Sequence, residues 1–195
     1  MVKKNSYVDA YEKLIQIWML CKQIAQVYSF YKYFLARAQG ERHSEAMIMM
    51  SNICYDYIVI NWAKICGSDK EDLHYKNAFI GTCVSSDIVR DNFLYELKFT
   101  EGEYIVYWNH FRELRNQGLA HFDFHKVYEL KPNNLYFDKI PVQCVSIAKS
   151  VVYTFEEEYK LFPQRQCSIT AQPHPVLLSD IVKHLKEEWR VYPID

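Results

Sequence analysis

Residues 14–35 read LIQIWMLCKQIAQVYSFYKYFL, and this stretch decides the fold class of the chain. Apolar side chains recur in it every three or four residues, which is the spacing of one face of an α-helix. The residues of this face are Leu14, Ile17, Trp18, Cys21, Ile24, Ala25, Tyr28, Tyr31 and Leu35. The pattern predicts a first helix from about Tyr7 to Ala38, with Gly40 as its stop. Because a helix of this length exceeds the average, a break within it is also compatible with the pattern.

The same spacing continues along most of the chain and predicts further helices. A second helix, capped by Ser44, is expected to end near Cys66, just before Gly67. Thr100 and Glu103 match a capping box, in which each side chain bonds the backbone N–H of the other residue, so a helix is expected from about residue 101. The other expected helices cover about 75–80, 85–98, 141–161 and 178–189.

The segment after residue 121 breaks the helical pattern. Val127–Leu130 and Leu135–Phe137 flank the polar stretch Lys131–Asn134, which predicts a small hairpin or an ordered loop as an insertion near 126–140. A loop is also expected over Pro163–Pro175. No repeat, low-complexity tract or linker divides the chain. The sequence therefore predicts a single all-α domain over residues 1–195, a bundle of five to seven helices.

Composition narrows the class of protein. Among 195 residues only 5 are Gly and 6 are Pro, while half are hydrophobic, which argues against a turn-rich all-β fold and against disorder. The formal net charge of -1 excludes a strongly basic nucleic-acid coat, so any nucleic acid must bind a local cluster of cations. The 6 cysteines are dispersed and form no Cys-x-x-Cys pair, which disfavours a disulfide framework and a zinc ribbon.

The N-terminal residues carry lysines but no long apolar run, because Glu12 and Lys13 interrupt the pattern early. We therefore expect no signal peptide and no membrane span, and a cytoplasmic location.

The most specific chemical signal is the stretch Phe111–His121, FRELRNQGLAH. It places Arg115, Asn116 and His121 late in an expected helix. A fixed cation can stabilise the extra negative charge of a phosphodiester-cleavage transition state. A histidine can move a proton near neutral pH. These residue types therefore suit metal-free cleavage of a phosphodiester.

Helical geometry alone does not bring these groups together. In an ideal helix Arg115 and His121 lie ~120° apart around the axis and ~9 Å apart along it. A symmetric dimer that crosses two copies of this helix could gather them in one cleft. The structural alternative is that Arg115 pairs with Glu113 or Glu96, and that His121 is a polar helix end.

The spacing Arg115-Asn116-x-x-x-x-His121 in a small all-helical protein resembles the HEPN superfamily, and in particular abortive-infection HEPN proteins of the AbiU type. The resemblance implies a homodimer with the motif helices at its interface and metal-independent RNA cleavage. It implies that Arg115 stabilises the transition state, Asn116 orients the phosphate or the histidine, and His121 acts as general acid or base. Some family toxins carry a tyrosine two residues after the histidine, where this chain has Asp123. The resemblance therefore does not extend to control by modification of that tyrosine.

Neighbouring residues suggest two further interpretations. Arg112, His125 and Lys126 are candidates for binding RNA phosphates, although a solvated charged surface explains them equally well. His121 and His125 are spaced so that a helix could aim both at one metal, with Asp123 nearby. No second ligand cluster accompanies them, so we expect no metal site and no cofactor.

Together with the suitability of Arg115 and His121 for phosphodiester cleavage, the resemblance implies a metal-independent endoribonuclease that leaves 2′,3′-cyclic phosphate and 5′-hydroxyl ends. Its expected role is that of a toxin or antiviral effector, with RNA as substrate and an antitoxin as a candidate partner. Two alternatives stay open: a non-catalytic helical module for interaction or ligand binding, and a metal-dependent hydrolase that uses His121, Asp123 and His125.

Overall fold

The computed structural model describes residues 6–38, 45–119, 134–165 and 183, and every regular element within them is a helix. The elements are α1 (Ser6–Ala38), α2 (Glu45–Cys66), α3 (Tyr75–Ala78), α4 (Ser86–Leu97), α5 (Glu101–Glu113), η1 (Leu114–Leu119), α7 (Asn134–Phe137) and α8 (Lys139–Arg165). The prediction of an all-α bundle is confirmed. The first helix runs unbroken over 33 residues.

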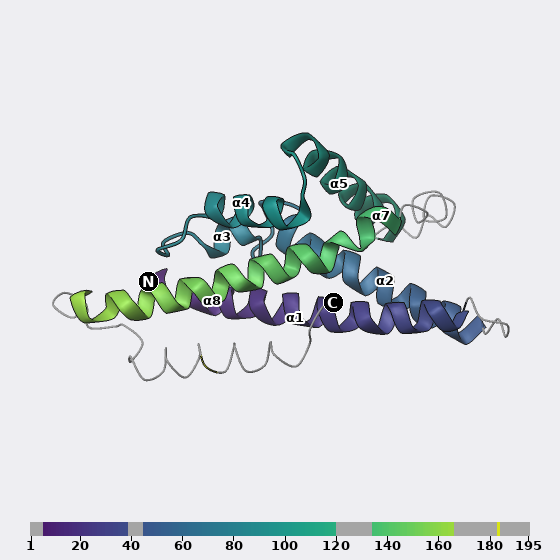
Figure 1. Ribbon diagram of the computed structural model, residues 1–195, viewed down its shortest axis with the longest axis horizontal. Helices are drawn as coiled ribbons and strands as arrows, with labels where there is room; N and C mark the ends of the chain where they lie inside the picture. Colours follow the sequence, from purple (N-terminus) through teal and green to yellow (C-terminus); the bar gives the residue numbers. More distant parts are fainter. Residues whose placement is uncertain (1–5, 39–44, 120–133, 166–182, 184–195) are drawn as a thin grey trace, which may run out of the picture.

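The three longest helices form the base of the bundle, and α1 and α8 lie side by side along its long axis (Figure 1). Both α2 and α8 run antiparallel to α1. Tyr31 on α1 lies against Tyr55 on α2, with ring centroids 6.1 Å apart, and Tyr11 at the other end of α1 lies 5.4 Å from Phe155 of α8. Helix α4 packs on α8, while α5 and η1 lie against α2. This arrangement brings the helix with the Arg-Asn motif onto the C-terminal half of α2.

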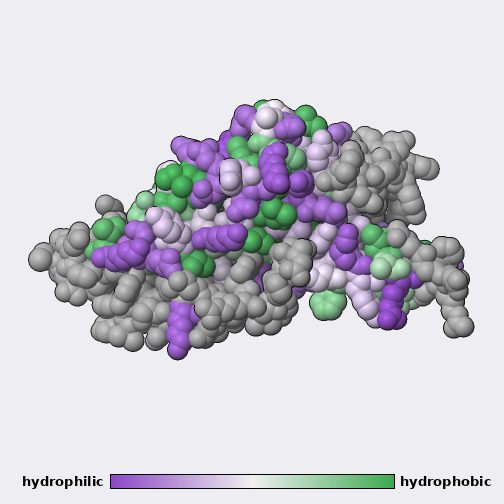
Figure 2. Space-filling model, viewed as in Figure 1, coloured by the Kyte–Doolittle hydropathy of each residue, from purple (hydrophilic) through white to green (hydrophobic). Residues whose placement is uncertain are grey.

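Surface and core separate in the manner of a globular bundle. Figure 2 shows hydrophilic side chains over much of the described part of one face, with hydrophobic ones in small groups among them. None of the described helices combines the length and the apolar character that a membrane crossing requires.

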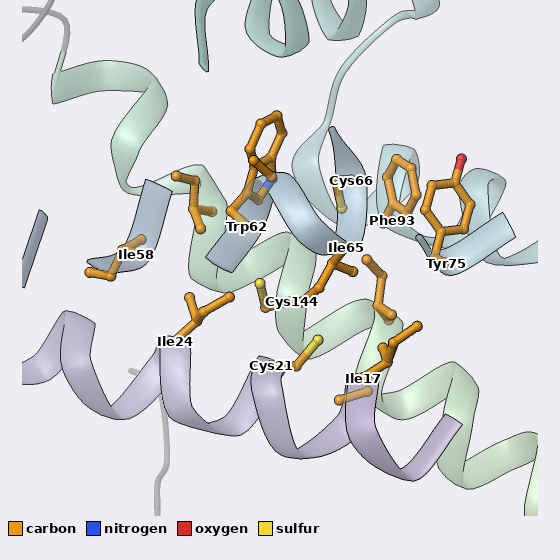
Figure 3. Close-up of a cluster of buried hydrophobic side chains, with 14 of the residues drawn as sticks. Ile17, Cys21, Ile24, Ile58, Trp62, Ile65, Cys66, Tyr75, Phe93 and Cys144 are labelled. Atoms are coloured by element: carbon orange, nitrogen blue, oxygen red, sulfur yellow. The ribbon is translucent and has the colours of Figure 1, made fainter. Parts of the chain in front are cut away.

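Several cysteines lie at the centre of the core as free thiols. Figure 3 shows Cys21, Cys66 and Cys144 within a cluster of buried aliphatic and aromatic side chains. The five cysteines in the described ranges are free, and Cys83 is the exposed one. Burial raises the pKa of the Cys21 and Cys66 thiols, so both stay protonated and act as small apolar groups.

A buried carboxamide joins three helices. Gln143 of α8 is fully buried, and its Oε1 accepts hydrogen bonds from Trp62 Nε1 of α2 at 2.8 Å and from Tyr107 OH of α5 at 2.9 Å. Its Nε2 donates to Tyr104 OH, also on α5, at 3.2 Å. Buried polar groups are costly unless they are paired, so these bonds define how α2, α5 and α8 sit against one another.

Local signals placed most helix ends correctly. The Thr100 hydroxyl accepts from Glu103 N, and the Glu103 carboxylate accepts from Thr100 N at 2.7 Å, which confirms the capping box. Ser85 caps α4, and Lys98 ends that helix in the left-handed conformation, with φ 56°.

Two expectations about the second half were wrong. Residues 134–137, expected to form part of a hairpin or an ordered loop, instead form the helical turn α7, and Phe137 packs on Tyr55 with ring centroids 4.2 Å apart. Helix α8 continues past Pro163 to Arg165 instead of ending near Leu161. Proline has no backbone N–H, so it cannot make the hydrogen bond to the residue four positions earlier, and this is why an end before Pro163 was expected. Residues 126–133 lie outside the described ranges, as does nearly all of the expected helix 178–189.

We expect Gln143→Met to lower the free energy of unfolding by about 2–5 kcal/mol, because the indole N–H of Trp62 and the hydroxyl of Tyr107 lose their buried acceptor. Urea denaturation measures the loss. Lys149→Met is the matched control, since Lys149 lies on the same helix and its side chain is 62% exposed. Equal stabilities for the two variants would contradict the role given to Gln143.

Candidate functional site

The helix that leads to Arg115 and Asn116 changes from an α-helix to a π-helix just before these residues. Helix α5 ends at Glu113, and Leu114–Leu119 form a π-helix, η1, that packs on α2. The expectation that one α-helix carries Arg115 and Asn116 was therefore wrong, because both lie in a π-helix. His121 lies outside the described residues, so its offset from Arg115 stays a prediction. Short π segments inside helices are frequent at functional sites. Arg115 and Asn116 lie within this segment.

A pocket of about 440 Å³ adjoins this π segment. It lies between the end of α2, the loop over residues 67–74, and one side of α5. The lining residues are Ala63, Gly67, Ser68, Asp69, Lys70, Glu71, Trp108, Arg112, Arg115 and Asn116. Three residues singled out by the sequence, Arg112, Arg115 and Asn116, therefore lie together. His121, Asp123, His125 and Lys126 lie outside the described residues.

Arg115 is held from two sides. Its Nη2 donates to Glu71 Oε1 at 3.2 Å, and its Nη1 donates to Asn116 Oδ1 at 3.0 Å. Its ion-pair partner is thus neither of the glutamates that the sequence suggested, and Glu96 instead pairs with Lys149 at 3.5 Å. The Arg115 side chain is 41% exposed, so part of its guanidinium stays open to the pocket.

The loop that carries Glu71 is held by its own hydrogen bonds. Asn77 Nδ2 donates to the carbonyl oxygens of Asp69 at 2.8 Å and of Glu71 at 2.9 Å. Glu71 N donates to Ser68 O at 2.9 Å. Because both polar groups of the Glu71 backbone are bonded, the loop holds its carboxylate opposite Arg115.

Gly67 makes the turn into this loop possible. A Cβ at this position would lie 2.4 Å from the carbonyl oxygen of Ala63, which is closer than real Cβ atoms approach. The Gly67 N–H donates to that same oxygen at 2.9 Å. A side chain here would push the backbone away from α2 and open one wall of the pocket.

Some charged residues around the pocket form ion pairs with one another, and others do not. Asp69 pairs with Lys76 at 3.3 Å and Asp72 with Lys13 at 2.6 Å. Within the described parts of the chain, Lys70 and Arg112 form no ion pair. These two cations, together with Arg115, make one side of the pocket positive.

An aromatic ring completes the pocket. Trp108 Nε1 donates to Cys66 O at 2.6 Å, and the Arg112 guanidinium carbon lies 4.5 Å from the centre of the indole ring. The hydrogen bond fixes the edge of the indole, and the ring keeps Arg112 in place. Guanidinium groups, an ammonium group, an amide and an indole are the groups that bind a phosphate and stack with a base.

A second pocket, of about 200 Å³, shares Asp69 and Trp108 with the first. His74 lies in its wall, and the Nδ1 of this buried residue accepts from Lys76 N at 3.3 Å as the cap of α3. Burial lowers the pKa of His74 to about 4, so the imidazole is neutral at neutral pH. Because Nδ1 accepts, the proton of the neutral ring is on Nε2.

Metal binding finds no support in the described part of the chain, where no three His, Cys, Asp or Glu residues gather closely enough to hold an ion. The residues of the metal-dependent alternative, His121, Asp123 and His125, lie outside it.

Sequence reasoning missed Lys70, Glu71 and the role of Trp108 in the pocket. Lys70 and Glu71 lie in a charged segment between two expected helices, and Trp108 lies within the expected helix that begins near residue 101. No local signal connects Glu71 with Arg115, because 44 residues separate them.

Comparisons with models of known protein families, with curated proteins and with solved structures gave no match to this chain. Its function must therefore be inferred from the chemistry of the two pockets.

We expect the free energy of unfolding to fall as the pH drops from about 6.5 to about 4, because the unfolded chain takes up a proton that buried His74 resists. Burial also lowers the pKa of His110, which adds a loss of the same sign. His74→Asn keeps a capping side chain but cannot titrate, so its loss of stability should be smaller.

Urea denaturation of parent and variant at about pH 7.5 and about pH 5 measures the difference. His110 is present in both proteins, so its contribution to the loss of stability is the same in each and does not affect the difference. Equal losses in the two proteins would show that His74 is not held neutral in the fold.

Proposed function

We propose that this protein is a metal-independent endoribonuclease of the HEPN type, acting as a toxin or antiviral effector. The observation that supports this most directly is the gathering of Arg115 and Asn116 with Lys70, Arg112 and Trp108 in one pocket of about 440 Å³. That volume falls within the ~300–1,000 Å³ of sites for small organic ligands, so a nucleotide of an RNA strand fits it by size.

The proposed reaction consumes no water and needs no redox partner. The ribose 2′-oxygen attacks the neighbouring phosphorus and gives up its proton to a base. The bond from phosphorus to the 5′-oxygen breaks, and that oxygen leaves with a proton. The products are a 2′,3′-cyclic phosphate and a 5′-hydroxyl, and DNA is excluded because it lacks the nucleophile.

In this mechanism Arg115 stabilises the negative charge that builds on the phosphate oxygens. Asn116 already accepts a bond from Arg115 through Oδ1, so its Nδ2 is left to donate to the phosphate. His121 is the proposed general acid or base. Lys70 and Arg112 bind flanking phosphates, and Trp108 stacks with a base. His125 and Lys126 stay predictions for further phosphate contacts.

Glu71 adds a condition to this mechanism. Its carboxylate occupies a donor of Arg115 in the unliganded pocket, 3.2 Å from Nη2. A phosphate that reaches Arg115 must share the guanidinium with this carboxylate or displace it. The exposed fractions of the two side chains, 41% and 35%, make the pair a weak one that an anionic ligand can disrupt.

The homodimer and the antitoxin partner belong to the same proposal. A dimer would bring two copies of the motif to one interface, in line with the resemblance to HEPN proteins. The competing function is a non-catalytic helical module for interaction or ligand binding, in which the motif is a structural polar cluster or part of a binding cleft. The Arg115–Glu71 ion pair favours the structural cluster, because such a cluster would contain a pair of this kind.

We expect purified protein to cleave RNA in excess EDTA, and we expect Arg115→Ala and His121→Ala each to slow cleavage about 10²- to 10³-fold. Arg37→Ala is the matched control, since Arg37 is an exposed arginine in the last turn of α1. Gel analysis with end-group mapping measures rate and product. Cleavage by Arg115→Ala at the parental rate would contradict the proposal, and RNA binding without cleavage by the parent would favour the module.

Removing the charge of Glu71 should strengthen RNA binding. We expect Glu71→Gln to lower the Kd for a non-cleavable 2′-O-methyl oligonucleotide by a factor of about 1.4 to 5, because exposed ion pairs contribute about 0.2–1 kcal/mol. Asp72→Asn removes a charge from the same loop, but Asp72 pairs with Lys13 away from the pocket, so its effect should be smaller. Equal effects of the two variants would show that only net charge matters.

A further inference from the structure

The smaller pocket continues the larger one along α5. Tyr104 and Trp108 are four residues apart, and Arg112 follows after four more, so all three lie on one side of the helix at steps of ~6 Å. Tyr104 and Trp108 line the smaller pocket, whereas Trp108 and Arg112 line the larger one. A strand bound along α5 would therefore reach both pockets in sequence.

Size restricts what the smaller pocket can hold. Its volume of about 200 Å³ is less than half that of its neighbour. It also lies below the ~300–1,000 Å³ that is usual for pockets binding whole small organic ligands. It has room for one planar ring system but not for the attached sugar and phosphate. A base could therefore enter it while its sugar and phosphate stay outside, in a strand bound along α5.

The lining offers an aromatic platform for such a ring. Trp108 is fixed through its bond to Cys66 O and is the ring that a base can stack on. Tyr75 and Tyr104 lie behind it as buried parts of the wall, and the Arg90 guanidinium carbon lies 5.5 Å from the centre of the Tyr104 ring. Stacking on an aromatic side chain contributes to binding for every base, because each base has a π-face.

Polar groups around the platform discriminate between bases. Lys76 is a donor, and Arg90 is a second donor that also pairs with Glu101. The carboxylate of Asp69 is an acceptor that lies 3.3 Å from Lys76 Nζ and 3.7 Å from Nε2 of the buried His74. Guanine carries two neighbouring N–H donors for a carboxylate, and its O6 and N7 accept from Arg or Lys. Adenine presents an amino group where guanine has O6, so it would place a donor against these cations.

We infer that the smaller pocket is a base-binding subsite, selective for guanine, for the nucleotide next to the phosphate held by Arg115. This inference rests on the proposed function for the cleavage step, but the binding of a guanine base can be measured without cleavage. Asp69, at 68% exposed, selects the base, and Trp108 supplies most of the affinity by stacking.

The inference can be tested by a substitution that fills the smaller pocket with a larger side chain. Ile105 lines the smaller pocket and is 48% exposed, so Ile105→Trp should block it without disturbing the core. Val106→Trp is the matched control, since Val106 is the adjacent apolar residue, 56% exposed, and lines neither pocket. Asp69→Asn keeps the shape of the acceptor side chain and removes its charge. Thermal unfolding checks that all three variants fold.

Calorimetric titration with guanosine and adenosine 5′-monophosphates gives the first readout. We expect the parent and Val106→Trp to bind the guanine nucleotide about fivefold or more tightly than the adenine nucleotide. Ile105→Trp should weaken guanine binding about tenfold or more, and Asp69→Asn should lose the preference. Equal binding of the two nucleotides by the parent, or unchanged guanine binding in Ile105→Trp, would overturn the inference.

Sequencing the ends of a cleaved random RNA pool gives the second readout. Guanine should be enriched at one position beside the cut for the parent and not for Ile105→Trp. Cleavage by the parent without such enrichment would overturn the subsite and leave the nuclease intact. Selective guanine binding by a parent that cleaves no RNA would support the subsite and contradict the proposed function.

Discussion

The structure depends on the carboxamide of Gln143, which is fully buried and bonds to Trp62, Tyr104 and Tyr107. A buried donor or acceptor left without a partner costs about 1–3 kcal/mol, so rotating α2, α5 or α8 against the others would lose several such bonds. With α5 held in this orientation, Trp108 meets the end of α2 at Cys66 O. The wall between the two pockets is therefore a consequence of packing at the core.

The pocket itself is built from a rigid loop and a modified helix end. Hydrogen bonds within the loop hold Glu71 opposite Arg115, and the π turns of η1 bring Arg115 and Asn116 to the pocket. An arginine between a carboxylate and an amide is positioned before any ligand arrives. Such preorganisation benefits a transition state that carries more charge than the substrate, but the same carboxylate weakens the attraction for a resting phosphate.

The fold alone says little about the chemistry, because helical bundles serve both enzymes and binding modules. The combination of neighbouring groups is what favours the proposed RNA substrate. Cations without carboxylate partners in the described residues lie beside an indole, and a small aromatic pocket with mixed donors and an acceptor adjoins them. A structural polar cluster accounts for the Arg115–Glu71 pair but not for the two adjoining pockets lined by such groups.

The sequence by itself determined the helices, because periodicity and capping depend on residues only a few positions apart. Thr100 and Glu103 marked the start of α5 correctly. Arg112, Arg115 and Asn116 were candidates from the sequence, and the structure places all three at one pocket. Tertiary structure decided the rest. Phe137 packs on Tyr55, more than eighty residues earlier in the chain, in a helical turn where a hairpin or an ordered loop was expected. Glu71 meets Arg115 across 44 residues, and only the packing of α5 on α2 brings that loop to the motif, since no local pattern encodes a contact between distant segments.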